Sequence, residues 1–435
     1  MALTLIDSPR PWSPRGQRLI YAMTSTSTAQ PGFRVQAAVY KVSTAETFTF
    51  MLSLDPTGSI LYDLGSVVTL RNYEDDPDLH SRTGFQDEPA GSGFEEYTIT
   101  FTEYWLVGGV LTPNAGGAVT SDAILVNNGY FQMRDGYSPN TNTGSINVKY
   151  ALTSAANSRA MSDRFASTHT WTSIYSAYSG NPTPLLPTLI QIPVREADYG
   201  LILVPGTDGY LTSNVVDKYR VNLYDNTGTI HTFTTASFPN NVMIQLGVYP
   251  ANLNDDPAAT EKPSMYPGWR YYRLEFLNAA NSLISARYVF YNTEEWGQWD
   301  CRYTPVRLAW VNSRGGWDYF NFIKKNEITN SIERKQYKQT RWRSTSPFYL
   351  SSDRVLTDRE TIVTQSLSVT SDWLQENEYV FLRSLLVSNQ VHIVQDDGTF
   401  LPASIEDTSF LERRERNGKL YNLQLRVKYS QDYWT

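Results

Sequence analysis

The chain has 435 residues, of which 41% are apolar and 19% are charged, so its composition is that of a globular protein rather than a disordered one. This length predicts two to four domains, because single hydrophobic cores stop growing well below 435 residues. The net charge of −7 argues against bulk nucleic-acid binding, which gains most of its affinity by neutralising phosphates.

The single cysteine, Cys301, excludes an intrachain disulfide and any multi-cysteine metal site. The opening residues "MALTLIDSPRPWSPRG" lack a basic segment followed by an apolar stretch, and no window of about eighteen apolar residues occurs in the chain. We therefore expect neither a secretion signal nor a membrane span.

Most of the chain alternates apolar and polar residues in the manner of β-strands. Examples in chain order are "RVQAAVYKV", "ETFTFMLSL", "YTITFTEYWLV", "YRVNLYD" and "RYYRLEF". Gly, Pro, Asn and Asp separate these segments and favour turns between them. The sequence therefore predicts a mainly β protein.

Motifs in residues 33–107 recur in the same order in residues 219–285. The matched pairs are Phe33-Arg34-Val35 with Tyr219-Arg220-Val221, Phe48-Thr49 with Phe233-Thr234, Leu64-Gly65 with Leu246-Gly247, and Asp75-Asp76-Pro77 with Asp255-Asp256-Pro257. A fixed order with a drifting offset is expected of a duplicated domain whose loops have changed length.

A further motif also recurs: Gly, an aromatic residue, two more residues and Tyr, at residues 93–97 and again at 268–272. This pattern is typical of the corner into a late strand of an immunoglobulin-like sandwich, where the Tyr hydroxyl satisfies a backbone group. We therefore expect tandem immunoglobulin-like or fibronectin-like β-sandwich domains over residues 1–130 and 186–300, the second a duplicate of the first.

Residues 131–185 are rich in Ser, Thr, Asn and Ala and show little periodicity. Such a stretch favours an irregular linker, or an arm that lies on a neighbouring subunit. Residues 301–435 predict an α+β module that is β-rich and contains one clear helix. Asp372 and Gln375 are expected to cap that helix, and its apolar stripe comprises Trp373, Leu374, Phe381, Leu382, Leu385 and Leu386.

The stretch "LAWVNSRGGWDYFNF", residues 308–322, has two aromatic arms around Gly315 and Gly316. A phosphate-binding loop needs a helix after its glycines, whereas the residues that follow here are typical of a strand. We therefore expect a β-hairpin in which both glycines supply positive φ angles.

No pattern in the chain selects a catalytic, metal-binding or cofactor-binding residue. The four histidines, His80, His169, His231 and His392, lie in unrelated segments, which argues against a zinc site. The carboxylates of residues 71–96 lack the spacing of a calcium loop and favour an acidic surface that faces solvent or a partner. We therefore expect no cofactor and no enzymatic activity.

Six residues are candidates for interfaces. Trp310, Trp317 and Tyr319 of the predicted hairpin are expected to be core or interface anchors. Arg341, Trp342 and Arg343 end a basic stretch, residues 324–343. Such a stretch suits a strand edge guarded by charges, a stacking surface for nucleic acid, or a subunit contact with the acidic front of a neighbour.

Three segments together resemble proteins of one class. They are "PRPWSPRGQRLIYAMTSTSTAQPGFRVQAAVYKV" (9–42), "TPVRLAWVNSRGGWDYFNF" (304–322), and the helix near residues 371–375 with "VHIVQDDGTFLPASIEDTSFLERR" (391–414). They resemble virion structural proteins of tailed bacteriophages, especially those of Bacteroidota hosts. The resemblance implies a tail, baseplate or neck protein, made in the host cytoplasm and located in the virion. Its implied partners are other virion proteins and copies of itself in a ring-like homo-oligomer.

Two other functions fit the same composition. Aromatic residues make up 13% of the chain, so a sandwich that binds host-surface glycan is an alternative, with Trp296, Trp299 and Trp317 as its candidate residues. A glycan-degrading enzyme that pairs two distant carboxylates is a second alternative, although nothing in the sequence selects the pair.

Overall fold

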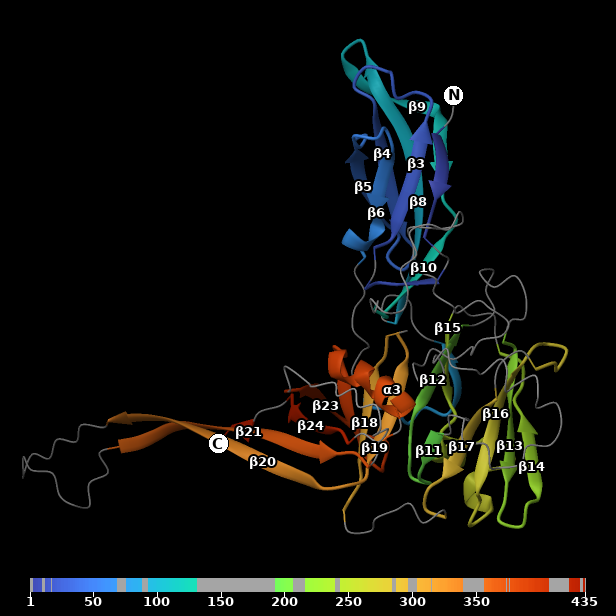
Figure 1. The fold of residues 1–435 in the computed structure, drawn as a ribbon, viewed down its shortest axis with the longest axis vertical. Helices are drawn as coiled ribbons and strands as arrows, with labels where there is room; N and C mark the ends of the chain where they lie inside the picture. The colour runs from blue at the N-terminus through green and yellow to red at the C-terminus, as the bar shows by residue number, and fades with distance from the viewer. Residues whose placement is uncertain are drawn as a thin grey trace, which may run out of the picture.

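The computed structural model describes residues 3–9, 12–16, 18–68, 76–87, 93–130, 192–205, 216–238, 243–283, 287–295, 303–313, 315–338, 356–372, 374, 376–406, 422–430 and 433–434. Within these residues the chain is mainly β, as the sequence predicts. Figure 1 shows an elongated first sandwich, a second sandwich, and a C-terminal sheet from which a two-stranded ribbon projects. The linker predicted at residues 131–185 lies outside the described residues.

The first sandwich consists of two facing sheets. One sheet has the order β1 (Leu3–Asp7), β3 (Ile20–Ser25), β6 (Ile60–Asp63). The other has the order β2 (Trp12–Pro14), β10 (Ile124–Asn127), β8 (Phe94–Val107), β4 (Arg34–Lys41), β5 (Glu46–Leu52), and β9 (Val110–Thr120) also pairs with β8. Between the sheets the rings of Tyr21 and Tyr62 pack on Phe101, with centroids 5.6 and 6.1 Å away.

The second sandwich repeats this plan. Its larger sheet has the order β11 (Ile192–Val194), β17 (Tyr288–Asn292), β16 (Tyr271–Leu277), β13 (Lys218–Tyr224), β14 (Ile230–Thr234). As in the first sandwich, the first strand of this order is parallel to its neighbour and the other pairs are antiparallel. This shared order is what duplication of a domain would produce.

The strand register locates equivalent residues in the two sandwiches. Val39 pairs with Phe48 on one side, and Val221 pairs with Phe233 in the corresponding place. The sequence match of Phe48 with Phe233 therefore agrees with the register. The match of Val35 with Val221 does not, because the structural equivalent of Val221 is Val39, four residues later. An even shift along a strand keeps the same face buried, so hydrophobic alternation alone does not detect it.

Two smaller repeats have physical counterparts in the structure. Asp76 and Asp256 each accept a hydrogen bond from the backbone N–H two residues later, at 3.1 and 2.8 Å. The buried Tyr272 hydroxyl donates to the carbonyl of Val248 at 2.7 Å, so it satisfies a backbone group as the corner motif predicts.

One segment of the first domain belongs to the second sandwich. The smaller sheet of the second sandwich has the order β12 (Leu201–Pro205), β15 (Met243–Gly247), β7 (Gly84–Asp87). We call residues 76–87 the crossover segment. The helix α2 (Pro250–Asp255) also holds it, because the side-chain amide of Asn252 donates to the carbonyls of His80 and Arg82 at 2.8 Å each. The expected boundary at residue 130 therefore does not separate the two sandwiches.

The C-terminal sheet carries one helix on one of its faces. Its order is β19 (Trp317–Phe322), β18 (Val306–Val311), β22 (Val391–Val394), β23 (Phe400–Ile405), β24 (Gln424–Tyr429), β21 (Leu356–Thr370), β20 (Asn326–Lys338), and β25 (Tyr433–Trp434) also pairs with β21. The helix α3 (Glu376–Val387) buries Phe381, Leu382 and Leu385 against this sheet. It starts later than the expected cap at Asp372, whose carboxylate lies 3.4 Å from Lys324 Nζ.

The β18–β19 hairpin forms as the sequence predicts. Gly315 has a φ of 82°, but Gly316 is not among the residues with positive φ, so one glycine rather than two supplies the left-handed conformation. Space is a second constraint, because a Cβ on Gly315 would lie 2.9 Å from the backbone nitrogen of Gly129. The turn also accepts a hydrogen bond from the N–H of Tyr130, which lies 2.9 Å from the carbonyl of Ser313.

Candidate functional site

The three aromatic residues predicted as anchors in the hairpin are all buried. Trp310 is 0% exposed, Trp317 is 2% exposed and Tyr319 is 3% exposed. Trp310 packs with α3, and its indole N–H donates to the hydroxyl of Ser384 at 2.9 Å. Trp317 and Tyr319 lie in the core of the second sandwich. The β18–β19 hairpin therefore contributes side chains to two hydrophobic cores. Trp317 has no exposed ring face on which a sugar could stack.

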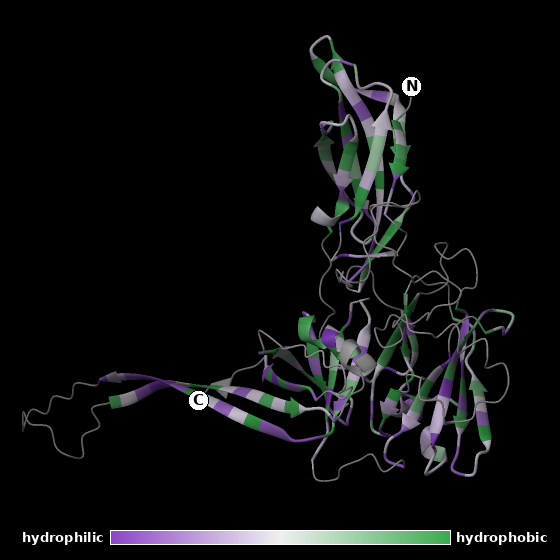
Figure 2. Cartoon of the chain, viewed as in Figure 1, coloured by the Kyte–Doolittle hydropathy of each residue, from purple (hydrophilic) through white to green (hydrophobic). Residues whose placement is uncertain are grey.

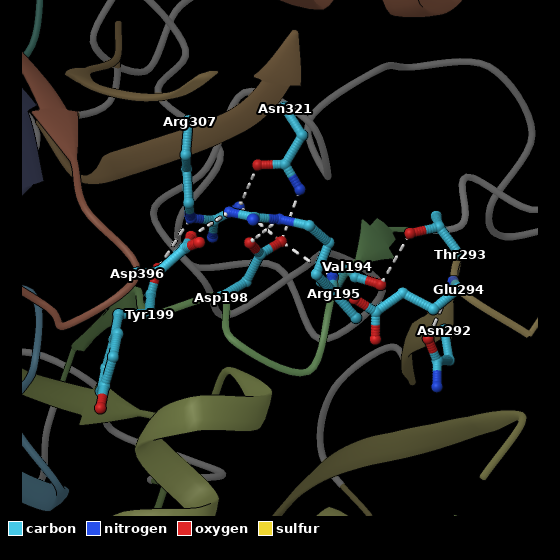
Figure 3. Close-up of polar contacts among 10 residues, drawn as sticks. All are labelled: Val194, Arg195, Asp198, Tyr199, Asn292, Thr293, Glu294, Arg307, Asn321 and Asp396. Carbon is cyan, nitrogen blue, oxygen red and sulfur yellow. Dashed lines mark hydrogen bonds and ion pairs between the residues drawn. The ribbon is translucent and has the colours of Figure 1, made fainter. Parts of the chain in front are cut away.

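A buried carboxylate joins the hairpin to the second sandwich (Figure 3). Arg195 Nε lies 2.8 Å from Asp198 Oδ1, and Arg307 Nη1 lies 3.1 Å from Asp198 Oδ2. The side-chain amide of Asn321 donates to the same carboxylate. Arg307 Nε also donates to the carbonyl of Tyr199 at 2.9 Å. Buried charges are tolerated when they are paired and hydrogen-bonded, so this network fixes β18 and β19 against the second sandwich.

Arg195 and Arg307 also make contacts outside this carboxylate network. Arg195 Nη2 lies 2.8 Å from Asp396 Oδ1, so the β22–β23 turn is attached as well. The guanidinium of Arg307 lies over the rings of Tyr249 and Tyr319, 4.9 and 4.8 Å from their centroids. Such cation–π contacts add to the ion pair when they are shielded from water. The network therefore has a structural role: it attaches the β18–β19 hairpin and the β22–β23 turn to the second sandwich.

Two histidines that are distant in sequence meet at the same junction. His80 Nε2 lies 2.8 Å from His392 Nδ1, and His80 Nδ1 lies 2.9 Å from the hydroxyl of Tyr319. The N–H of Leu201 donates to that hydroxyl at 2.9 Å. His80 and His392 lie in unrelated segments of the sequence, so no local sequence signal could have revealed their contact. Burial and the adjacent His392 and arginines lower the pKa of His80 well below its usual range.

The largest exposed feature is the ribbon of β20 and β21, which leaves the body of the molecule in Figure 1. Almost every residue of β20 is exposed. Its exposed apolar side chains include Ile328 at 59% and Ile332 at 55%. The register places Ile328 opposite Leu367 and Ile332 opposite Val363, so these residues share one face of the ribbon. Figure 2 shows hydrophobic residues spaced along both of its strands.

The ribbon also presents an open edge. β20 is the last strand of its sheet, and among the described residues no strand pairs with its outer side. Lys335 Nζ lies 2.9 Å from Glu360 Oε2 across the ribbon, so some charged side chains of the ribbon are paired with each other. An exposed edge of 13 residues offers unpaired N–H and C=O groups to another chain.

A second apolar surface lies at the far end of the first sandwich. The β8–β9 turn consists of Gly108 and Gly109, both with positive φ. Its flanking side chains are aliphatic and exposed, and they are Leu106, Val107, Val110 and Leu111. Ends of this kind are typical of contact points with other molecules.

Three tyrosines lie in a row on the outer face of the larger sheet of the second sandwich. The register pairs Tyr224 with Tyr271 and Tyr271 with Tyr291. The rings of Tyr224 and Tyr271 stack on each other, 4.3 Å apart, and Arg273 lies over Tyr224. Since Tyr224 and Tyr271 already stack on each other and on Arg273, these two rings give limited support to the glycan-binding alternative.

Several residues named from the sequence lie outside the described residues. These are Arg341, Trp342 and Arg343 of the basic stretch, Trp296 and Trp299 of the glycan alternative, and Cys301 and His169. Among the residues that the structure describes, no group of three or more His, Cys, Asp or Glu side chains is placed to hold a metal ion. None of the described helices is long and apolar enough to span a membrane.

Comparison with known proteins gives no assignment: no protein-family model matches the chain, and no curated protein matches it.

Proposed function

We propose that the protein is a structural component of a tailed-bacteriophage virion, in the tail, baseplate or neck, and that it acts through protein–protein interfaces. The resemblance of three sequence segments suggests the kind of particle. The single observation that supports an assembly role is the ribbon of β20 and β21, whose exposed Ile328 and Ile332 and whose open edge are not covered by the described parts of the subunit.

Among the described residues, 356–361 of β21 pair with β20 alone, so the outer end of the ribbon is two-stranded. Two paired strands gain little stability in water unless they pack on a further strand or on a hydrophobic surface. Ile328 and Ile332 are more than half exposed, so much of the apolar area that would stabilise the ribbon is unused. A partner that covers this face would contribute about 25 cal/mol for each Å² of apolar surface removed from water. Copies of the same chain and other virion proteins are the proposed partners.

The first experiment is mass spectrometry of purified particles from the source lysate, followed by cryo-electron microscopy of their tails. We expect the protein at a fixed ratio to the portal and as an ordered ring. Absence of the protein from purified particles would rule out the proposed function.

A second experiment tests the ribbon itself. In the double variant Ile328→Thr, Ile332→Thr we expect a loss of incorporation into particles with an unchanged unfolding midpoint, because both side chains are exposed in the subunit. Ile230→Thr is the matched control, because Ile230 is also exposed on a strand, at 52%, but lies on the second sandwich. Equal incorporation of both variants would show that the ribbon is not the contact.

A further inference from the structure

The crossover segment is held at one end by backbone pairing and at the other by a buried histidine. Its β7 strand pairs with β15, and Asn252 of α2 binds two of its carbonyls. His80 is fully buried, and the rings of Trp317 and Phe400 meet it edge-on, with centroids 5.0 and 5.2 Å away. This histidine therefore connects the crossover segment to β19, β22 and β23 of the C-terminal sheet.

The contact between His80 and His392 constrains their protonation. One of the two facing nitrogens must donate and the other must accept, so both imidazoles cannot be protonated while the 2.8 Å contact persists. The other nitrogen of His80 is engaged by Tyr319, so neither nitrogen of His80 contacts a carboxylate. A proton taken up by His80 would thus place a positive charge in the core without a bonded counter-charge.

The surrounding groups make that charge more costly. Around the pair are Arg82 of the crossover segment, Arg307 of β18, Tyr319 of β19, the neutral amide of Asn252 on α2, and the ring of Phe400 on β23. The two arginines are positive, and their carboxylate partners are already engaged: Arg82 lies 2.7 Å from Asp76 and Arg307 lies 3.1 Å from Asp198. The lowered pKa of His80, caused first by burial and then by these charges, agrees with this geometry.

We propose that His80 and His392 form an acid-sensitive latch, which holds the crossover segment against β19, β22 and β23 at neutral pH and releases it when the histidines take up protons. Release would loosen the connection between the first sandwich and the rest of the chain. Histidine is suited to this role because its usual pKa lies between pH 6 and 7, so mild acidification changes its charge.

The test is hydrogen exchange of the intact chain between pH 7.5 and 5.5, expressed as protection factors so that the intrinsic pH dependence is removed. Opening should become about tenfold more favourable if one histidine takes up a proton on release, and about 100-fold if both do. We expect this loss of protection at the amides of β7 and of β22, and little change in β4 and β8 of the first sandwich. Unchanged protection of β7 at pH 5.5, or an equal loss throughout the chain, would overturn the proposal.

Variants separate the latch from other titrating groups. In the double variant His80→Gln, His392→Gln the loss of protection on acidification should disappear. His231→Gln is the control, because His231 is partly exposed, lies 3.2 Å from Asp225 and is on the second sandwich away from the His80–His392 contact; this variant should respond as the natural chain does. A double variant that keeps the full acid response would contradict the latch. If the double variant does not fold, the site-resolved exchange of the natural chain decides the question.

Discussion

Arg307 Nη1 lies 3.1 Å from Asp198 Oδ2, and both side chains are almost completely buried, at 2% and 0% exposure. Asp198 follows the first strand of the second sandwich, whereas Arg307 lies on β18 of the C-terminal sheet. The pair therefore connects two parts of the chain that the sequence presents as separate domains. Because a buried charge is costly when it loses its partner, these two parts are expected to unfold together.

Arg307→Met tests this connection. Methionine fills much of the same space without the charge, and it leaves Asp198 with Arg195 and Asn321 as its remaining partners. We expect a loss of about 3 kcal/mol in the free energy of unfolding, measured by urea titration. Lys335→Ala is the control, because the Lys335–Glu360 pair is largely exposed and should cost less than about 1 kcal/mol. Similar losses in the two variants would mean that the buried network does not join the two parts.

Gly315→Ala tests the docking of the hairpin turn on the first sandwich. Alanine there would adopt an unfavourable positive φ, and its Cβ would lie 2.9 Å from the backbone nitrogen of Gly129. Gly228→Ala carries only the first cost, because Gly228 has a φ of 87° and no atom within 4 Å of the added carbon. We expect Gly228→Ala to cost about 1–2 kcal/mol and Gly315→Ala clearly more, in thermal unfolding. If the two variants melt alike, the close approach to Gly129 is not a real constraint.

The sequence predicted those features that depend on neighbouring residues. Alternation identified the strands, and the aromatic arms around Gly315 identified the hairpin, because each depends on a few adjacent positions. The recurring Asp-Asp-Pro and Gly-aromatic motifs pointed to two related sandwiches, and the shared strand order agrees with that prediction. The α3 helix was expected, but it begins at Glu376, later than the predicted cap at Asp372, whose carboxylate lies 3.4 Å from Lys324 Nζ instead.

The features that escaped prediction depend on distant partners. Nothing within residues 84–87 indicates that β7 pairs with β15 rather than with a strand of the first sandwich, because edge pairing is specified by the backbone. His80 and His392 are 312 positions apart, so only the folded chain brings their rings together. Trp317 was predicted to be either a core or an interface anchor, and its place in the core of the second sandwich shows that it is a core residue.

Tyr272→Phe tests the corner of the second sandwich. The Tyr272 hydroxyl is buried and donates to the carbonyl of Val248, so its removal leaves a buried acceptor without this partner. We expect a loss of about 1–3 kcal/mol in the free energy of unfolding. Tyr271→Phe is the matched control on the next residue, since Tyr271 faces outward on the same strand and should change stability by less than about 0.5 kcal/mol. Equal effects would show that the corner hydrogen bond is not a stabilising feature.

Alkaline pH should unfold the chain through its buried tyrosines. Burial raises the pKa of Tyr272 and of Tyr319 above the usual value near 10. These hydroxyls therefore keep their protons in the folded chain at a pH where the unfolded chain has lost them. Because the unfolded state then binds fewer protons, the free energy of unfolding falls as pH rises above about 10, by about 1.4 kcal/mol per pH unit for each such tyrosine.

The measurement is the phenolate absorbance during a pH titration, recorded together with circular dichroism. We expect part of the phenolate signal to appear only when the β-sheet signal is lost, because buried tyrosines ionise on unfolding. In Tyr272→Phe that delayed part should shrink. A smooth phenolate titration that is complete before any loss of β-sheet would show that the hydroxyls of Tyr272 and Tyr319 are accessible to solvent in the folded chain.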